Sequence, residues 1–208
     1  MGFGEKDVSN SINMSIKIVF ASSNRHKIDE IKALLPEGFE LLSSADAGFT
    51  EEVEETGKTF EENAALKANA LFDASGLLCF SDDSGLEVEA LKKAPGVRSA
   101  RYAGEPCDAS KNNVLLLENL KDKTNRKARF VTVICLRMPH KTFFFEGFIE
   151  GEIALAPRGN NGFGYDPLFV PKGSDKTFAE MDAETKNSMS HRHNALMKML
   201  PFLDYLRA

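Results

Sequence analysis

Two acidic segments of the sequence have the residue types and spacing of a divalent-cation site. Glu54 and Glu55 are adjacent in one segment, and Asp82 and Asp83 are adjacent in the other, directly after an apolar run at residues 77–80. Neighbouring carboxylates repel each other and raise each other's pKa unless a cation or hydrogen-bond donors compensate. Because Mg²⁺ prefers oxygen ligands and shares them with substrate phosphates, we predict a metal–phosphate site. The alternative is that Asp82 caps a turn and Asp83 is solvated.

The first acidic segment also contains Gly57, Lys58 and Thr59, which resemble the end of a phosphate-binding P-loop. That motif requires a glycine five residues before its second glycine, and this position holds Glu52. A loop rich in carboxylates would repel bare phosphates. We therefore reject the P-loop interpretation.

Two lysines are candidates for binding phosphate. Residues 22–27 (SSNRHK) join a predicted strand, Ile16–Phe20, to a predicted helix. Backbone N–H groups at the start of a helix favour an anion, and Lys27 adds a full positive charge. Lys67 lies four residues after Asn63 and shares its face of a second predicted helix. Capped helices with solvated lysines would explain the same pattern.

Residues 159–167 (GNNGFGYDP) form a glycine-rich loop that could bind a nucleotide base. Glycine permits unusual backbone angles and the close approach of a ligand. The ring of Phe163 could stack on a base, and the carboxylate of Asp166 could bind the polar edge of the base. The alternative is a tight loop with Phe163 in the hydrophobic core.

Residues 190–196 (SHRHNAL) predict the start of a helix with basic residues in its first turn. Ser190 is a suitable cap, and His191 and Arg192 are donors that suit a carbonyl or phosphate oxygen. Solvated side chains are again the alternative. A metal pair of His191 and His193 is disfavoured, because residues two apart on a helix do not face each other.

Capping signals predict the helices that position these groups. Thr59 and Glu62 form a capping-box pattern, and the apolar periodicity that follows predicts a helix ending near Ser75. The C-terminal segment also has helical periodicity. Because Pro201 lies inside it, we expect a kink or a break there.

Apolar and β-branched runs predict the strands. Residues 77–80 form one short run, and residues 128–137 and 141–150 form two longer runs separated by a turn. Strands alternate with helices early in the chain, and a hairpin follows. This order predicts an α/β protein with a mixed sheet.

The length and charge of the chain limit the possible functions. The sequence has 208 residues, of which 42% are hydrophobic, and a formal net charge of -5. One large domain or two small lobes fit this length. A negative net charge argues against stable nucleic-acid binding, which requires a basic surface. An anionic ligand would therefore need a local cluster of cations or a metal.

Cysteine content and apolar runs indicate the compartment. The three cysteines are far apart, and no CxxC pair is present, so a disulfide framework is not expected. The sequence contains no apolar run of the roughly 20 residues that cross a bilayer, and residues 1–13 have no signal-peptide core. We predict a cytoplasmic protein without membrane association, in which residues 1–14 are a disordered extension and residues 15–208 form one two-lobed domain.

Six segments in order resemble one known family. They are ASSNRHK, EETGKTFEEN, SDDSGL, PGVRSARYAG, GNNGFGYDP and SHR. From about Ile16 to the C-terminus, the chain resembles the inosine triphosphate pyrophosphatase family. The resemblance implies Mg²⁺-dependent hydrolysis of ITP, dITP and XTP to the monophosphate and pyrophosphate. It also implies a homodimer of elongated α/β subunits, each with two lobes, a long curved mixed sheet flanked by helices, and an active cleft between the lobes.

The resemblance also implies roles for individual residues. Metal ligands would be Glu54 and Asp83, with Asp82 close by as a further candidate. Asp83 would be the proton acceptor, and Lys67 would assist catalysis. One departure from the family is Ser22-Ser23-Asn24 where Thr-Gly-Asn is common. The implied substrate-binding residues are Ser22, Ser23, Asn24, Lys27, Ser84, Phe163, Gly164, Tyr165, Asp166, Lys186, His191 and Arg192.

Two other functions fit parts of the pattern. A house-cleaning pyrophosphatase could act on modified pyrimidine or methylated nucleotides instead. A nucleotide-binding module without catalysis would keep the base loop and the basic residues, but it would have no use for Glu54 and Asp83 together.

Overall fold

The computed structural model describes residues 15–205, so the expectation of disorder in residues 1–14 lies outside the described residues. Within this range, six strands form one mixed sheet in the order β2-β1-β3-β4-β5-β6. β1 pairs in parallel with β2 and β3, and the pairs from β3 to β6 are antiparallel. In chain order the strands are β1 (Ile16–Phe20), β2 (Phe39–Ser43), β3 (Cys79–Val88), β4 (Lys127–Met138), β5 (Lys141–Ile153) and β6 (Phe169–Pro171). The predicted α/β fold with a mixed sheet is confirmed.

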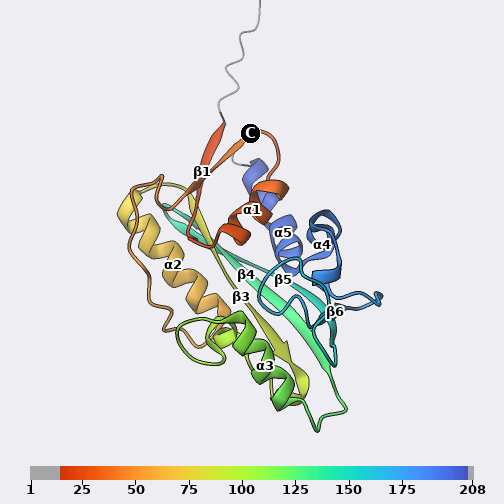
Figure 1. Cartoon of the computed structure of the whole chain (residues 1–208). Coiled ribbons are helices and arrows are strands. Elements are labelled where there is room, and N and C mark those ends of the chain that lie inside the picture. The colour runs from red at the N-terminus through yellow and green to blue at the C-terminus, as the bar shows by residue number, and fades with distance from the viewer. Residues whose placement is uncertain (1–14, 206–208) are drawn as a thin grey trace, which may run out of the picture.

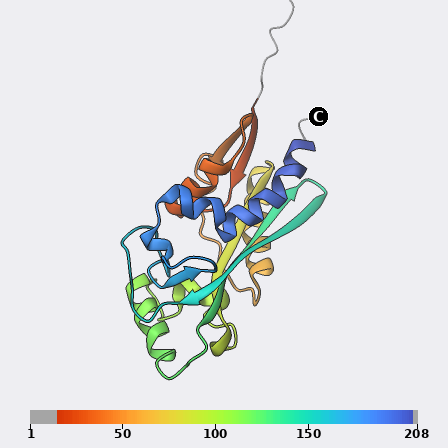
Figure 2. The same ribbon diagram turned by 90° about the vertical axis from the view of Figure 1, so that its right-hand side faces the viewer.

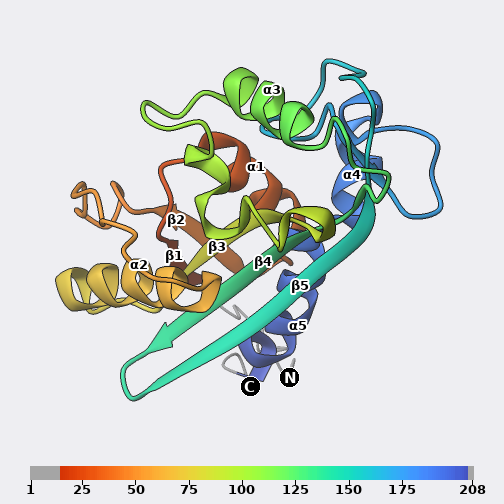
Figure 3. The same ribbon diagram turned by 90° about the horizontal axis from the view of Figure 1, so that it is seen from below.

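Helices cover both faces of this sheet (Figure 1). α2 packs on β3 and β4, whereas α5 packs on β4 and β5 from the other side. Figure 2 shows α5 crossing the β4–β5 hairpin, and Figure 3 shows α2 and α5 on opposite sides of it. The α-helices are α1 (Arg25–Leu34), α2 (Phe60–Ser75), α3 (Ala109–Asn119), α4 (Ala183–Met189) and α5 (His191–Tyr205); the short 3₁₀ helices are η1 (Glu89–Leu91), η2 (Gly96–Arg101) and η3 (Phe178–Glu180).

The capping box predicted at the start of α2 is present, and the helix ends at Ser75 as predicted. The hydroxyl of Thr59 accepts a hydrogen bond from the backbone of Glu62, and the carboxylate of Glu62 accepts one from the backbone of Thr59. Gly76 ends the helix with φ of 66°, a left-handed conformation that costs glycine little. The buried side chains of α2, including Ala64 and Ala68, face Cys135 of β4.

Two predicted elements differ from the structure. β3 was expected at residues 77–80, but it continues to Val88 and includes both aspartates. It continues because its whole length from Cys79 to Val88 pairs with β4. α5 continues through Pro201, so of the predicted kink or break the break is wrong. Leu203 beyond the proline is fully buried, and this packing favours a continuous helix.

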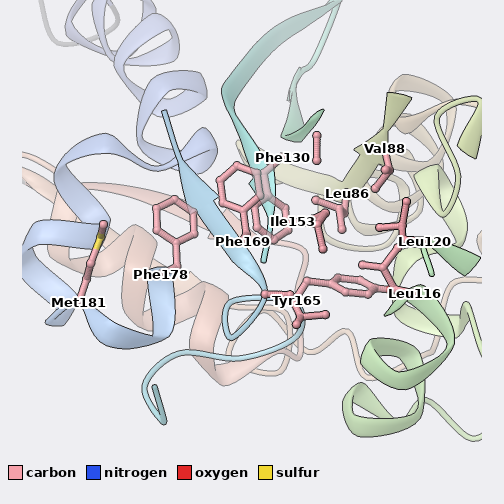
Figure 4. Close-up of a cluster of buried hydrophobic side chains, with 12 residues drawn as sticks. Leu86, Val88, Leu116, Leu120, Phe130, Ile153, Tyr165, Phe169, Phe178 and Met181 are labelled. Carbon is pink, nitrogen blue, oxygen red and sulfur yellow. The ribbon is translucent and has the colours of Figure 1, made fainter. Parts of the chain in front are cut away.

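Two hydrophobic cores lie at the two ends of β3 and β4. The first core includes Phe80 and Ile134 and packs beneath α1 and α5. The second core includes Leu86 and Phe130 and packs beneath α3 (Figure 4). Because side chains alternate along a strand, Phe80, Asp82, Ser84 and Leu86 share one face of β3. A polar segment therefore separates the two cores.

Among the helices of residues 15–205, none has the length and apolar character that crossing a bilayer requires.

Candidate active site

The polar segment of β3 presents its two aspartates to opposite faces of the sheet. In the β3–β4 register, Asp82 lies opposite Ile134 and Asp83 lies opposite Val133. Ile134 belongs to the core under α1 and α5, whereas Val133 packs against Phe60 at the start of α2. The repulsion predicted between adjacent carboxylates is thus relieved first by strand geometry, which points the two side chains apart.

Asp82 is the centre of a buried group of cations. Its carboxylate accepts hydrogen bonds from Nζ of Lys27 at 2.9 Å, from Nε of Arg192 at 3.3 Å and from Oγ of Ser84 at 2.7 Å. Burial by itself would raise the pKa of Asp82, but Lys27 and Arg192 outweigh it and hold this pKa below its ordinary value. Asp82 is therefore ionised, and it neutralises the two cations.

The ion pairs continue from Asp82 toward the glycine-rich loop. Arg192 also pairs with Glu30 of α1. Lys186 of α4 lies 2.9 Å from Oε1 of Glu30 and 2.8 Å from Oδ2 of Asp166. Each of these five side chains is buried. Glu30 was not among the predicted site residues, although its position three residues after Lys27 on one helical face is a signal that could have identified it.

The glycine-rich loop holds Phe163 at the end of this series of ion pairs. The backbone N–H of Phe163 donates to Oδ2 of Asp166 at 2.8 Å, and Nζ of Lys186 lies 4.7 Å from the centre of the Phe163 ring. Gly162 has φ of 74°, and a Cβ atom there would collide with the carboxylate of Asp166. Tyr165 anchors the loop by donating to the carbonyl oxygen of Ser99 at 2.8 Å. The ring of Phe163 is half-buried, so it is not simply a core residue.

His191 is buried at the start of α5. Its imidazole stacks on Phe130 with 4.8 Å between the ring centroids. Burial and the nearby charges of Arg192 and Lys186 lower its pKa well below 6.5, so the ring is neutral. Within the described part of the chain, Nδ1 of His191 has no hydrogen-bond partner. A buried polar atom of this kind can bind a ligand at little cost.

Asp83 has looser contacts on the other face of β3. Nδ2 of Asn63 donates to Oδ2 of Asp83 at 3.0 Å, the backbone N–H of Ser84 donates to Oδ1 at 2.9 Å, and Nζ of Lys67 lies 3.9 Å from Oδ1. Burial raises the pKa of Asp83 to about 6, and the negative charge of Glu55 adds to the effect. A carboxylate with this pKa is ionised at neutral pH and can still accept a proton.

Lys67 connects Asp83 with the first acidic segment. Its ammonium lies 2.6 Å from Oε1 of Glu55, and Arg101 lies 3.5 Å from the other oxygen of Glu55. Burial would lower the pKa of Lys67, but Asp82, Asp83 and Glu55 outweigh it and raise this pKa. The backbone N–H of Gly57 also donates to Oδ1 of Asn63 at 2.8 Å, so Asn63 joins the acidic loop to Asp83.

The donor set around Lys67 suits a divalent cation. Two carboxylates, Glu55 and Asp83, surround one ammonium that already serves as their counter-ion. Within residues 15–205 no cluster of three or more His, Cys, Asp or Glu side chains could hold a metal by itself. Mg²⁺ commonly uses one or two carboxylates and completes its shell with phosphates and water, so two carboxylates fit it. Glu54, the predicted ligand, has an exposed side chain in the same loop.

Residues 22–24 turn from β1 into α1. The hydroxyl of Ser22 accepts a hydrogen bond from the backbone of Asn24 at 3.2 Å, and Oδ1 of Asn24 caps α1 by accepting from the backbone of Lys27 at 3.3 Å. Ser23 is exposed. The loop therefore presents a helix N-terminus and Lys27 next to Asp82, as the phosphate-binding prediction requires.

The structure brings most of the predicted residues together from six segments of the chain. Lys27, Lys67, Asp82, Asp83 and Ser84 form one part of the site. The other part contains Phe163, Asp166, Lys186, His191 and Arg192. Glu30, Asn63 and Arg101 are additional members that were not predicted as site residues, and Glu55 was predicted only as part of the acidic pair with Glu54.

In this α/β protein a helix N-terminus with an adjacent lysine lies near an aromatic loop, an arrangement that suits a phosphorylated ligand. Comparison with known proteins defines the class of protein. The model of the Ham1 family matches residues 18–202, and the chain belongs to this family.

Relatives match this chain over most of its length. The dITP/XTP pyrophosphatase of Porphyromonas gingivalis is 50% identical over 188 residues, which cover 90% of this chain and 97% of that protein. The protein of the same name from Flavobacterium psychrophilum is 48% identical over 187 residues, which cover 90% and 98%. The structure of the Staphylococcus aureus Ham1 protein aligns with a TM-score of 0.83 and 44% identity, over 90% of this chain and 98% of that one.

Proposed function

We propose that this protein is a nucleoside triphosphate pyrophosphatase that hydrolyses dITP, XTP and ITP to the monophosphate and pyrophosphate. The observation that carries the proposal is one connected site. It runs from the aromatic loop at Phe163 through Lys186, Glu30 and Arg192 to Asp82 and Lys27. Lys67, whose pKa is raised by both Asp82 and Asp83, links this series to Asp83 on the other face of the strand. The names of relatives that are nearly half identical to this chain support the same activity.

The cations of the site would neutralise the triphosphate. Lys27 extends from the N-terminal turn of α1, and Lys67 extends from α2. Both ammonium groups now pair with carboxylates, at 2.9 Å from Asp82 and 2.6 Å from Glu55. Phosphate oxygens can take over part of this pairing without leaving a buried charge unpaired. The acidic surface of the protein would otherwise repel the ligand.

Asp83 would accept the proton of the attacking water. The water oxygen forms a bond to the α-phosphorus, its proton passes to a carboxylate oxygen of Asp83, and the bond from the α-phosphorus to the bridging oxygen breaks. Pyrophosphate then leaves. The pKa of about 6 makes Asp83 a suitable base near neutral pH, because it is ionised yet basic enough to take a proton. Asn63 and the backbone of Ser84 fix the orientation of its carboxylate.

We propose Mg²⁺ as the metal, held by Asp83 together with Glu54 or Glu55 of the acidic loop. When bound, such an ion neutralises charge that develops on the leaving pyrophosphate. The surroundings of Lys67 support Glu55, and the family resemblance supports Glu54.

Base selection would depend on donors at the aromatic end of the site. Hypoxanthine and xanthine carry an oxygen at C6, whereas adenine carries an amino donor. His191 and Arg192 are buried donors. The amino group of adenine opposite them would leave the protein donors and its own N–H groups unpaired. Such mismatches discriminate strongly between substrates.

A direct test of this proposal is to measure pyrophosphate release from ITP, XTP, dITP, GTP and ATP, with and without Mg²⁺. We expect release from the first three nucleotides and little from ATP. Activity only on modified pyrimidine or methylated nucleotides would favour the house-cleaning alternative. Binding of ITP without release of pyrophosphate would favour a non-catalytic module.

We also propose that two subunits associate through the outer face of β5. Phe144 and Phe148 lie on this face, and their exposures are 41% and 42%. A groove beside them has a balanced set of acidic and basic side chains, including Arg129 and Glu150, which suits contact with a second copy. Sedimentation at several concentrations, with Phe148→Ser as the variant, measures this association.

We further propose a cytoplasmic location, a single two-lobed domain and no stable nucleic-acid binding. The buried thiols of Cys79 and Cys135 support a reducing cytoplasmic location, which fractionation of cells would examine. Residues 15–208 as one two-lobed domain would unfold in a single calorimetric transition. The net charge of -5 supports the absence of stable nucleic-acid binding.

A further inference from the structure

His26 and Phe163 form a stacked pair between two distant segments. Their ring centroids are 5.1 Å apart, and the ring planes differ by 13°. His26 belongs to the first turn of α1, and Phe163 belongs to the glycine-rich loop. Building on the proposed function, we propose that His26 is the second aromatic wall of the base site. A purine base is held between the imidazole of His26 and the ring of Phe163.

Phe163 is the fixed wall of this pair. Its backbone N–H is bound to Asp166 at 2.8 Å, and Asp166 is bound to Lys186 at 2.8 Å. The next residue, Gly164, accepts a hydrogen bond at its carbonyl oxygen from Asn113 of α3 at 3.0 Å. Several elements therefore hold the loop, and a ring in a fixed orientation binds a flat ligand at a low cost in entropy.

His26 is the movable wall. Its side chain is exposed, and within the described residues no hydrogen bond or ion pair holds its imidazole. The ring can therefore move outward when a base enters and then stack on the opposite face of the base. Its backbone stays in place, because Asn24 caps α1 through the backbone of Lys27.

The stack also lies at the correct end of the site. Lys27, the residue after His26, binds Asp82 at 2.9 Å, and Lys186 beneath Phe163 continues the ion pairs to Glu30. A base between the two rings would thus have its phosphates near the N-terminus of α1. One nucleotide could therefore contact the two rings with its base and Lys27 with its phosphates.

A stacking wall has a characteristic effect on specificity. It contacts the face of the base, which all purines share, and not the edge that distinguishes hypoxanthine from adenine. Loss of His26 should therefore weaken binding of every purine nucleotide by a similar factor. The ratio of kcat/KM for ITP to that for ATP should stay the same.

Steady-state kinetics of His26→Ala and His26→Phe measure this role. We expect His26→Ala to raise KM for ITP about tenfold with little change in kcat, because a base–aromatic stack has about this effect on binding. His26→Phe keeps a flat ring and should restore KM. Lys32→Ala, an exposed change on the same helix, is the matched control. An unchanged KM in His26→Ala would overturn the proposal, and a lower KM would show that His26 blocks the base.

A second measurement does not depend on turnover. The chain contains no tryptophan, so H26W introduces a single tryptophan, whose fluorescence can be excited apart from that of the three tyrosines. We expect IMP with Mg²⁺ to quench its fluorescence by stacking, whereas ribose 5-phosphate, which lacks a base, should not. K32W is the control and should respond to neither compound. If IMP fails to quench the H26W protein, the proposal is wrong. Pyrophosphate release by the unchanged protein separately decides the proposed function.

Discussion

Asp82 and Asp83 are adjacent in sequence, yet the protein gives them opposite electrostatic environments. Asp82 is surrounded by Lys27, Arg192 and the hydroxyl of Ser84, and its pKa is lowered. Asp83 has the more distant Lys67 as its cation at 3.9 Å, and burial raises its pKa to about 6. The strand places them on different faces, so one residue type serves two purposes.

The difference separates a structural region from a reactive one. Around Asp82 every charge is paired, and this region holds α1, α4 and α5 in place on the sheet. Around Asp83 the nearest cation, Lys67, lies 3.9 Å away and is held more closely by Glu55 at 2.6 Å, so Asp83 can accept a metal ion or a proton. Well-paired buried charges fix geometry and lower the pKa of Asp82, whereas a carboxylate whose pKa is raised toward neutral pH can take up and release a proton.

Asp82→Asn should lower the stability of the structural region around Asp82. It would remove the counter-ion of Lys27 and one of the two carboxylates that pair with the buried Arg192, which keeps Glu30, and breaking a buried pair costs about 3–5 kcal/mol. Chemical denaturation at pH 7 should show this loss in the free energy of unfolding. Glu87→Gln, which alters a more exposed pair with Arg129, should cost under about 1 kcal/mol and serves as the control. Equal losses in the two variants would contradict the comparison.

Asp83→Asn should lower the catalytic activity of the reactive region around Asp83. The amide cannot accept the proton of the attacking water, so turnover of ITP should fall by a factor on the order of 10² or more. The thermal unfolding temperature at pH 7 should rise and not fall, because the variant lacks the carboxylate whose burial destabilises the folded state, and this distinguishes lost chemistry from lost folding. Near-normal turnover would remove Asp83 from the reaction.

The raised pKa of Asp83 predicts a dependence of stability on pH. The folded pKa of about 6 exceeds the ordinary value of 3.8, so the folded state binds more protons between these values. As pH rises from 4 to 7, the unchanged protein should therefore lose about 2.4 kcal/mol relative to Asp83→Asn. Denaturation in the presence of a chelator measures this difference, which should be small near pH 4 and should vanish below it. A difference that shrinks as pH rises would show the opposite shift.

The smallest expected effect is on the Mg²⁺ dependence of turnover. It distinguishes Glu54 from Glu55 as the second metal ligand beside Asp83. Glu54→Gln and Glu55→Gln should differ in the Mg²⁺ concentration that gives half-maximal turnover. Replacing the true ligand should raise that concentration by about tenfold or more. Glu52→Gln, an exposed change in the same loop, is the control. Equal shifts in both variants would mean that neither glutamate alone accompanies Asp83.

Much of the fold could be predicted because its signals are local. The capping box at Thr59 and Glu62, the stop at Gly76 and the turn between β4 and β5 depend on residues a few positions apart. The extent of β3 could not be predicted, because polar residues in a strand interior oppose the apolar pattern. They are tolerated there because cations from distant segments neutralise them.

The site could be predicted in part. Residue types and order identified Lys27, Lys67, Asp83 and Arg192 as candidates. Glu30 appeared to be an ordinary charged residue of an exposed helix, and its burial against Lys186 and Arg192 joins positions more than 150 residues apart, with sequence separations of 156 and 162.

The sequence by itself determined which groups the protein has and where its helices begin and end, because capping and periodicity operate within a few residues. Only the tertiary structure decided which cation pairs with which carboxylate, and hence which aspartate is neutralised and which is basic. Those pairings follow from burial and strand register, which bring charges from separate segments to within hydrogen-bonding distance.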